Sequence, residues 1–332
     1  MNNYPLISVV IPTYRREKLL QDSILDVLKQ DYPHFEVLVV DQTQTHEPET
    51  KAFLADMAAS GKIKLFSLDW ASLPGARNYA VRRSSGEIIL FIDDDIQLTP
   101  GFLAAHGKNY VENPKIGAVA GRVFDRMKLG DSRGELEIEY LPPEAMDPGI
   151  AWYHIDLVHT TKPQQVLTAR GCNMSFRREV FTKYGIQFDE RFRGSAVREE
   201  SDFCLRFRQS GYEIWYDPEA YLVHLGEDTG GCHDISMRSL QYQLTFYHNH
   251  FLLGLKNLTF TQALRLYGRL FDCHVLGHPP CYKSASPIKV ATRSIFYFLG
   301  FLKAVGTMIQ SAWNDGQIYS RLDQQVEFCA RR

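Results

Sequence analysis

This chain of 332 residues lacks the run of about 18 uninterrupted apolar residues that a membrane-spanning helix needs. Its longest candidate, 295–309, is broken by Lys303 and by glycine and threonine residues. The first residues also lack the basic start and the cleavage site of a signal peptide. We therefore expect a protein that does not cross a bilayer and that works in the cytoplasm, at most attached to the cytoplasmic face of the membrane.

Cysteine is scarce as well. The six cysteines show neither CxxC spacing nor the dense pattern of a small disulfide-rich protein. Disulfides persist mainly in oxidising compartments. The cysteine content therefore favours a reduced, cytosolic setting.

Charge is distributed unevenly, although the formal net charge is only −2. Residues 235–332 contain 11 Lys and Arg and 4 Asp and Glu, whereas residues 1–234 contain 26 and 35. This asymmetry allows two interpretations: the basic tail faces an anionic surface such as a membrane, or it docks on the acidic body of the same molecule. We expect no nucleic-acid partner.

The sequence does contain a repeated alternation of apolar and amphipathic segments. Nearly continuous apolar runs predict strands that are buried on both faces of a sheet. The predicted strands are 6–11, 35–40, 63–68, 87–92, 166–176, 214–216 and 220–224, and the predicted helices are 16–29, 47–60, 75–84 and 199–209. Repeated βα units imply an α/β fold with a mostly parallel, doubly wound sheet flanked by helices. Loop signals over 122–165 predict irregular structure, and residues from 235 onward are predicted to be helical.

Three consecutive carboxylates, Asp93, Asp94 and Asp95, follow the strand predicted at 87–92. Like charges in a row repel one another, so a folded protein keeps such a cluster where a counter-charge offsets it. Mg²⁺ or Mn²⁺ would supply that charge and would also bind phosphate oxygens. Because ligands of open α/β sheets sit at the carboxyl ends of strands, the trio indicates a metal site. The alternative is a solvated acidic turn or a helix cap.

Polar residues also follow the first two strands and open the helix predicted at 75–84. The carboxylate of Asp41 is suited to accept a hydrogen bond from the imide N–H of uracil or thymine, while the backbone near Thr13 closes the base pocket. An Asx turn is the alternative for Asp41. The guanidinium of Arg77 favours an anion or a base carbonyl, and a surface salt bridge is its alternative.

Further candidates lie late in the acidic part of the chain. Glu199 and Glu200 begin the helix predicted at 199–209. Carboxylates in a first helical turn often only complement the helix dipole, but one of them could remove the proton of a sugar hydroxyl as a general base. Asp202 would then cap or orient the loop. His224 ends the last predicted strand, either as a structural residue or as a neutral imidazole that completes the cation site.

Together these segments resemble the inverting, family 2 glycosyltransferases of the GT-A fold. The resemblance covers approximately residues 5–230 and rests on seven segments in the family's order: 8–14, 40–41, 75–78, 92–95, 171–178, 199–200 and 223–224. It implies a nucleotide-sugar site formed by Pro12, Thr13, Tyr14, Asp41, Arg77, Asp93 and Asp94. It also implies that Asp93 and Asp95 form the family's DxD motif, with Asp95, His224 and Asp93 as the metal site.

The resemblance assigns the catalytic base to Glu200, at a position where the family usually has Asp. Glu199 is the alternative base. Gln42 is a second departure, because the family often has Asp or Asn after the residue that matches Asp41. The acceptor side of the cleft would be formed by Arg170, Gly171, Cys172 and Asn173.

These observations predict a catalytic domain over 1–234, with a nucleotide-sugar half to about residue 121 and an acceptor half over 122–234, and a helical extension over 235–332. The extension would contact a membrane surface or form a homodimer. The expected reaction, with Mn²⁺ or Mg²⁺ as cofactor, moves a sugar from a UDP-sugar, or as second choice a dTDP-sugar, to a glycan or lipid-linked saccharide. One alternative is a sugar nucleotidyltransferase, which the absence of glycine from 12–16 disfavours. The other is a non-catalytic protein that binds glycans or nucleotides.

Overall fold

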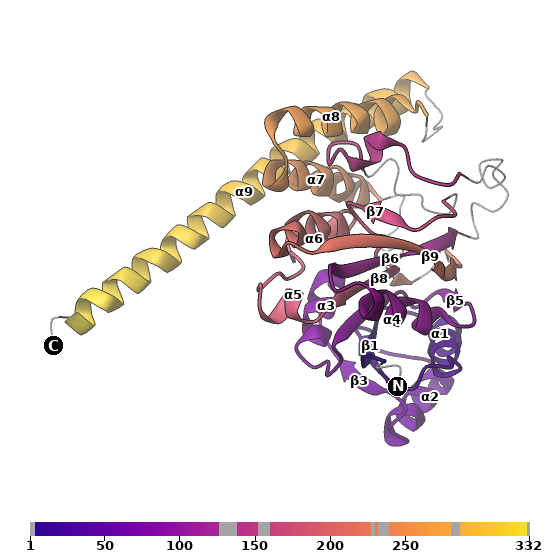
Figure 1. Ribbon diagram of the computed structural model, residues 1–332. Helices are drawn as coiled ribbons and strands as arrows, with labels where there is room; N and C mark the ends of the chain where they lie inside the picture. Colours follow the sequence, from indigo (N-terminus) through magenta and orange to yellow (C-terminus); the bar gives the residue numbers. More distant parts are fainter. Residues whose placement is uncertain are drawn as a thin grey trace.

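The computed structural model describes residues 4–125, 138–151, 160–226, 230–231, 239–279 and 286–330 (Figure 1). The irregular segment predicted over 122–165 lies partly outside these ranges. Its described part is not all irregular: it contains the last four residues of the strand Ile116–Asp125, a short 3₁₀ helix, Pro143–Met146, and the first residues of the strand Gln164–Val166.

The first half of the chain forms the predicted parallel sheet. Four strands pair in parallel in the order β3-β2-β1-β4, with helices in the connections. The strands are β1 (Ile7–Thr13), β2 (Phe35–Asp41), β3 (Lys64–Ser67) and β4 (Ile88–Ile92), and the helices are α1 (Lys18–Leu28), α2 (Pro48–Ala59) and α3 (Leu73–Val81). Every residue of β1 and of β4 is buried, as expected for strands with helices on both faces.

The second half continues the same sheet in mixed directions, in the order β4-β8-β6-β9-β5, and β7 pairs with β9. Its strands are β5 (Ile96–Leu98), β6 (Ile116–Asp125), β7 (Gln164–Val166), β8 (Asn173–Arg177) and β9 (Glu213–His224). Its helices are α4 (Phe102–Glu112), α5 (Glu179–Thr182) and α6 (Glu199–Phe207), followed by a 3₁₀ turn at Arg208–Ser210. Only β5, β7 and β8 run against the direction of the other strands.

Two of the predictions for this half need correction. The strand predicted at 166–176 is two strands, because β7 pairs with β9 while β8 inserts between β4 and β6. The strands predicted at 214–216 and 220–224 form one strand, β9, whose register against β6 shifts between Gly121 and Arg122. Such a bulge absorbs extra residues without ending the strand.

The C-terminal part is helical, as predicted, and packs beside α6 (Figure 1). It contains α7 (Leu240–Asn257), α8 (Phe260–Leu270), a π-helical turn (Phe271–Leu276) and the long α9 (Pro287–Ala330). A capping box between Thr259 and Gln262 begins α8. Phe192, which precedes α6, is 1% exposed and belongs to the hydrophobic core of these helices. Among the described residues, no helix is both long and apolar enough to span a membrane.

Candidate active site

A cleft lies where β1 and β4 end. It brings together seven of the predicted site residues, namely Pro12, Thr13, Tyr14, Asp93, Asp94, Asp95 and His224. Arg16, Gln42, Ser72 and Gly194 also line it. Because β1 and β4 are neighbouring parallel strands, their carboxyl ends meet at one edge, which is where open α/β sheets bind ligands.

The acidic trio has a counter-charge within the chain that we did not predict. The guanidinium of Arg16 lies 3.0 Å from Asp95 Oδ2 and 3.4 Å from Asp94 Oδ1, and its side chain is 4% exposed. Thr13 Oγ1 donates to Asp94 Oδ2 over 2.6 Å. Burial, and then the charge of Asp95, raises the pKa of Asp94 to about 7, although Arg16 opposes the change. One arginine does not balance three carboxylates, so the cluster still favours a cation.

Asp93, Asp95 and His224 form a candidate metal centre, because one ligand atom from each lies within 4.8 Å of the other two. Strand pairing explains the approach, since Ile96, next to Asp95, lies opposite His224 in the β5–β9 ladder. His224 Nε2 is 3.3 Å from Asp95 Oδ1 and 3.9 Å from Asp93 Oδ2. Two carboxylates and one imidazole are a donor set that suits Mn²⁺ or Mg²⁺ with further ligands from phosphate or water.

The pKa of His224 is raised by the carboxylates around it, and the same negative charge would attract a metal cation. Burial alone lowers the pKa of His224, but the carboxylates of Asp125, at 3.9 Å, and Asp95, at 3.3 Å, outweigh it and raise the pKa to about 11. Without a metal ion, the proton on the imidazole adds a positive charge to that of Arg16 beside Asp95. A divalent cation would take the place of that proton, as metal binding to histidine generally does.

Asp41 lies at the end of β2 but is not among the residues that line the cleft. Its Oδ2 is 2.9 Å from His46 Nε2, and its Oδ1 accepts from the Thr43 backbone N–H over 2.9 Å. The neighbouring Gln42 does line the cleft, and its Oε1 accepts from the Ser72 N–H over 2.6 Å. The position where the sequence departs from the family pattern therefore holds the helix start at α3.

Arg77 and Glu199 form a buried ion pair, each about 1% exposed. Arg77 also donates to the carbonyl of Gly171 over 2.9 Å, and its guanidinium is 3.8 Å from Asp93 Oδ1. The structure thus links the first residue of α6 to the edge of the metal centre through Arg77. Neither Arg77 nor Glu199 is among the described residues that line the cleft.

Glu200 is partly exposed and follows Glu199 on the first turn of α6. Its Oε1 accepts from the Ser201 hydroxyl over 3.2 Å. The residue before the helix, Arg198, has a φ of +78°, which is rare for a residue with a side chain. Its guanidinium donates to Ser201 Oγ and to His250 of α7, so contacts with the helical extension support the strained turn.

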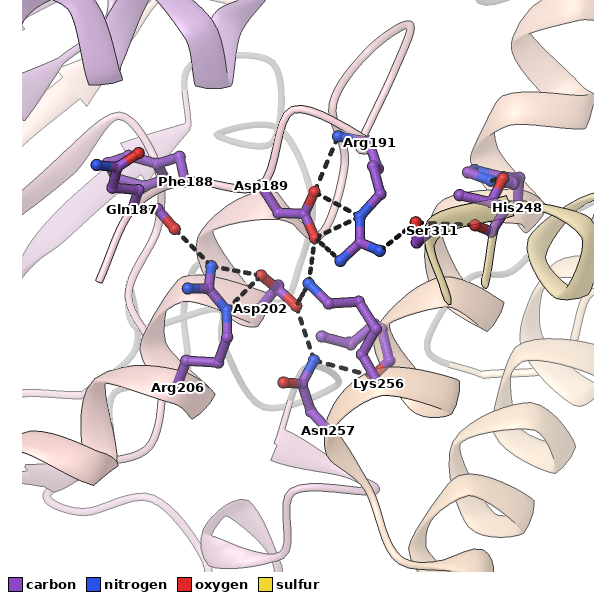
Figure 2. A network of polar contacts seen from close by, with 12 residues as sticks. Gln187, Phe188, Asp189, Arg191, Asp202, Arg206, His248, Lys256, Asn257 and Ser311 are labelled. Carbon is purple, nitrogen blue, oxygen red and sulfur yellow. Dashed lines mark hydrogen bonds and ion pairs between the residues drawn. The ribbon is translucent and has the colours of Figure 1, made fainter. Parts of the chain in front are cut away.

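A polar network joins α6 to α7 (Figure 2). Asp202, which is fully buried, accepts from Lys256 over 2.6 Å and from Asn257 over 2.7 Å, and it pairs with Arg206 on its other side. Lys256 also contacts Asp189. The prediction that Asp202 orients the loop did not identify Lys256 and Asn257, because they lie 54 and 55 residues away in the sequence.

The residues predicted for the acceptor side lie in different environments. Arg170 is partly exposed and pairs with Asp125 over 3.3 Å. Cys172 is buried, and burial raises the pKa of its thiol. Asn173 is fully buried, where its amide bonds to His106 and to the carbonyls of Arg122 and Ala220. The position of Asn173 is that of a core residue.

This sheet, with an acidic cluster and a histidine at its carboxyl edge, is the architecture of GT-A glycosyltransferases. The chain belongs to glycosyl transferase family 2, whose family model matches residues 8–185. The predicted family, fold and enzyme class are therefore confirmed.

Solved structures support the fold. The chain is similar to Staphylococcus aureus TarS 1–349, with a TM-score of 0.58 and 18% identity, covering 90% of this chain and 81% of that one. It is also similar to the mannosyltransferase PcManGT from Pyrobaculum calidifontis in complex with GDP-Man and Mn²⁺, with a TM-score of 0.53 and 17% identity, covering 94% and 80%. At these identities the likeness shows the fold alone.

Curated relatives match over shorter stretches. The O-antigen biosynthesis protein RfbC of Myxococcus xanthus is 28% identical over 66% of this chain and 17% of its own length. The Escherichia coli UDP-Glc:alpha-D-GlcNAc-diphosphoundecaprenol beta-1,3-glucosyltransferase WfgD is 35% identical over 29% of this chain and 36% of its own. This chain thus matches well under half the length of these relatives.

Proposed function

We propose that this protein is a metal-dependent, inverting glycosyltransferase that moves a sugar from a nucleotide-diphosphate sugar to a hydroxyl of a glycan or lipid-linked saccharide. The observation that carries the proposal is the group of Asp93, Asp95 and His224 in a cleft at the carboxyl ends of β1 and β4. A UDP-sugar is the first-choice donor and a dTDP-sugar the second. The Mn²⁺ and GDP-Man in the PcManGT structure support a metal and a nucleotide sugar in this fold.

The donor would lie along the cleft with its nucleotide toward β1 and β2. Pro12, Thr13 and Tyr14 would surround the base and ribose, and Asp41 would recognise the base by exchanging one of its present partners, His46 or the Thr43 N–H, for the base. Asp93 and Asp94 would complete this site near the ribose, and Arg77 would fix the position of Asp93. A cation bound by Asp95, His224 and Asp93 would stabilise the charge of the departing nucleotide diphosphate.

Glu200 would act as the catalytic base. Its carboxylate takes the proton of the acceptor hydroxyl while the hydroxyl oxygen bonds to the anomeric carbon, and the bond from that carbon to the diphosphate oxygen breaks. Attack from the face opposite the leaving group inverts the anomeric configuration. Glu199 is less suited to this role, because its carboxylate is buried against Arg77.

The acceptor would enter beside Arg170, Gly171 and Cys172. The buried amide of Asn173 would support this edge from beneath. WfgD and a Campylobacter jejuni relative, 31% identical over 103 residues, are described as glucosyltransferases that act on undecaprenol-diphosphate-linked sugars. Their acceptors support a lipid-linked saccharide here, used at the cytoplasmic face of a membrane.

The proposal is tested by screening UDP- and dTDP-sugars for released nucleotide with Mn²⁺, with Mg²⁺ and with EDTA. We expect release with one donor class, loss of release in EDTA, and a fall of about 100-fold or more in Asp95→Asn. Asp22→Asn is the matched control, because Asp22 is a half-exposed carboxylate on α1. Turnover that survives both EDTA and Asp95→Asn would refute the metal centre.

A further inference from the structure

A second hollow lies between the segment before α6 and the helices α7 and α9. Its volume is about 550 Å³, and Arg191, Arg193, His248, Lys303, Thr307 and Ser311 are among its lining residues. Arg193 is followed directly by Gly194, which lines the donor cleft. A Cβ atom at Gly194 would lie 2.7 Å from Thr245 Oγ1 of α7, so the segment at Gly194 packs closely against the extension. The hollow and the donor cleft therefore share one short segment of chain.

The hollow is positively charged. Arg193 and Lys303 are both exposed, and neither has an ion-pair partner among the described residues. The third cation, Arg191, is balanced by Asp189 at 2.7 Å. Burial lowers the pKa of His248, and the charges of Lys303 and Arg193 lower it further. No carboxylate is among the described lining residues.

Polar groups in the wall of the hollow are held in place by hydrogen bonds. Arg191 Nη1 donates to Ser311 Oγ over 2.6 Å, and His248 Nε2 lies 2.9 Å from Thr307 Oγ1. The segment itself is fixed to α7, because Asn249 donates to the Arg193 carbonyl over 3.0 Å. The site thus combines two exposed cations, Arg193 and Lys303, with a polar wall whose side chains are held in place, and guanidinium and ammonium groups recognise phosphate oxygens.

An exposed apolar stripe on α9 borders this hollow. The helix places six exposed apolar residues within an arc of roughly 100°. They are Ile288, Ile295, Phe298, Leu299, Leu302 and Ile309. Gly306, which lines the hollow, lies four residues after Leu302 and three before Ile309, so the end of the stripe meets the hollow on one face of α9. A contiguous apolar surface beside a cationic pocket matches an amphiphile with an anionic head group.

We infer that the hollow between α7, α9 and Arg193 is a subsite for the phosphate of a membrane-anchored acceptor, whose lipid chain or bilayer contacts the apolar stripe of α9. The inference rests on the proposed function, and it specifies the acceptor as a lipid phosphate that carries the saccharide. The saccharide would extend past Gly194 into the donor cleft. Phosphate binding in the hollow and bilayer contact by the stripe act together, so neither feature alone selects the acceptor.

The test measures binding of the full-length chain to phosphatidylcholine vesicles that carry a small fraction of a polyprenyl diphosphate. EDTA is present, so that cation-dependent binding at the donor cleft does not contribute. We expect Arg193→Gln/Lys303→Gln to weaken this binding about tenfold or more. The matched control is Arg208→Gln/Lys289→Gln, which removes the same two residue types from exposed positions outside the hollow.

Further experiments separate the contribution of the diphosphate head group from that of the lipid surface. Vesicles with phosphatidylglycerol at equal charge should bind the chain more weakly than the polyprenyl diphosphate vesicles do, and inorganic diphosphate alone should bind more weakly still. Leu302→Ser/Ile309→Ser should weaken binding to every vesicle while leaving the sedimentation mass unchanged. Vesicle binding needs no turnover and donor hydrolysis needs no acceptor, so the subsite and the proposed reaction can fail independently.

Three results would overturn the inference. The first is equal binding of the two charge-deletion variants to the polyprenyl diphosphate vesicles. The second is equal affinity for phosphatidylglycerol or for free diphosphate, which would indicate a general anion site. The third is a dimer that dissociates in Leu302→Ser/Ile309→Ser, because the stripe would then be a contact between two copies of the chain.

Discussion

At the scale of single residues, Glu199 and Glu200 are adjacent carboxylates with different surroundings. Glu199 is the counter-ion of a buried arginine, whereas Glu200 is partly exposed and has only Ser201 as a described hydrogen-bond partner. We predict that Glu200→Gln lowers kcat by about 100-fold or more, as loss of a general base does, while the free energy of unfolding changes little. The measurements are transfer kinetics and urea unfolding.

In Glu199→Gln we expect a larger loss of stability and a smaller loss of turnover than in Glu200→Gln. Removing the charge of Glu199 takes the nearest counter-ion from the buried guanidinium of Arg77, which keeps Asp93 at 3.8 Å, and should cost about 3 kcal/mol of stability. Turnover per folded molecule should fall less than in Glu200→Gln. If Glu199→Gln abolished turnover in a fully folded protein while Glu200→Gln remained active, Glu199 would be the base.

His46 is a residue that sequence patterns did not indicate. Burial lowers its pKa, but hydrogen bonds to Asp41 and Glu17 outweigh this and raise the pKa above the usual 6.5. The protonated His46 therefore stabilises the folded state fully below about pH 6.5. This contribution is lost as the pH rises through the raised pKa of His46. We predict an NMR titration midpoint above 6.5 for His46. The midpoint should fall in Asp41→Asn, and an unchanged midpoint would show that Asp41 does not hold the proton.

At the scale of secondary-structure elements, α6 is held to α7 by Asp189, Asp202 and Lys256 (Figure 2). Lys256→Met leaves the buried Asp202 and the partly buried Asp189 without their shared cation and should destabilise the fold by about 2–4 kcal/mol. Because α6 carries Glu200, kcat should fall as well. Lys29→Met is the control, since Lys29 makes an exposed ion pair with Asp26. Equal unfolding midpoints for the two variants would contradict this role of Lys256.

The same network predicts a loss of stability in acid. Burial raises the pKa of Asp189, but Arg191 and Lys256 outweigh it and hold the pKa well below its ordinary value. A depressed carboxyl pKa contributes stability above the unfolded-state pKa of about 4, and this is lost as the pH falls through the folded-state pKa. Urea unfolding between neutral pH and pH 3 should show this loss in the unaltered chain and less of it in Asp189→Asn. Identical slopes would exclude Asp189 as a source.

The sequence predicted the elements whose patterns are local. Strand β4 is a continuous apolar run, β1 and β2 are nearly so, and α1 has its buried Leu20, Ile24 and Val27 on one face. Among the described strands and α-helices of the sheet domain, β5, α4, β6 and α5 have no counterpart among the predictions. Helix α4 follows Gly101, an N-cap residue that has no side chain to cap the helix, and β5 has only three residues. Such elements are specified by their neighbours in the sheet rather than by periodicity.

The residues of the candidate site also differ in whether a local sequence pattern predicts them. The DxD residues were predictable because three carboxylates after a buried strand are a local signal. Arg16 was not identified, because its pairing with Asp95 depends on how the turn after β1 folds back. The ion pair between Asp202 and Lys256 joins α6 to α7, the first helix of the extension. Contacts of this kind become visible only when the whole fold is known.

At the scale of the whole molecule, the boundary predicted at residue 234 does not separate the hydrophobic cores. Phe192 lies before α6, yet it packs with Tyr247, Phe251, Leu252 and their neighbours in the helical extension. Lys256 lies 5.3 Å from the centre of its ring. The catalytic part therefore contributes a side chain to the core of the extension, and we expect the two parts to unfold in one cooperative transition.

Phe192→Ala tests this coupling. Removing a fully buried aromatic ring should cost about 3–5 kcal/mol and should lower the midpoint of the single calorimetric transition. Phe260→Ala makes the same chemical change at a side chain that is 78% exposed, so its effect should stay within about 0.5 kcal/mol. Two separate transitions, of which Phe192→Ala moves only one, would show that the extension folds as an independent unit. A single transition shifted by Phe192→Ala alone would show that the helices beside α6 are part of the catalytic fold, and that the proposed acceptor subsite and donor cleft are built on one structural unit.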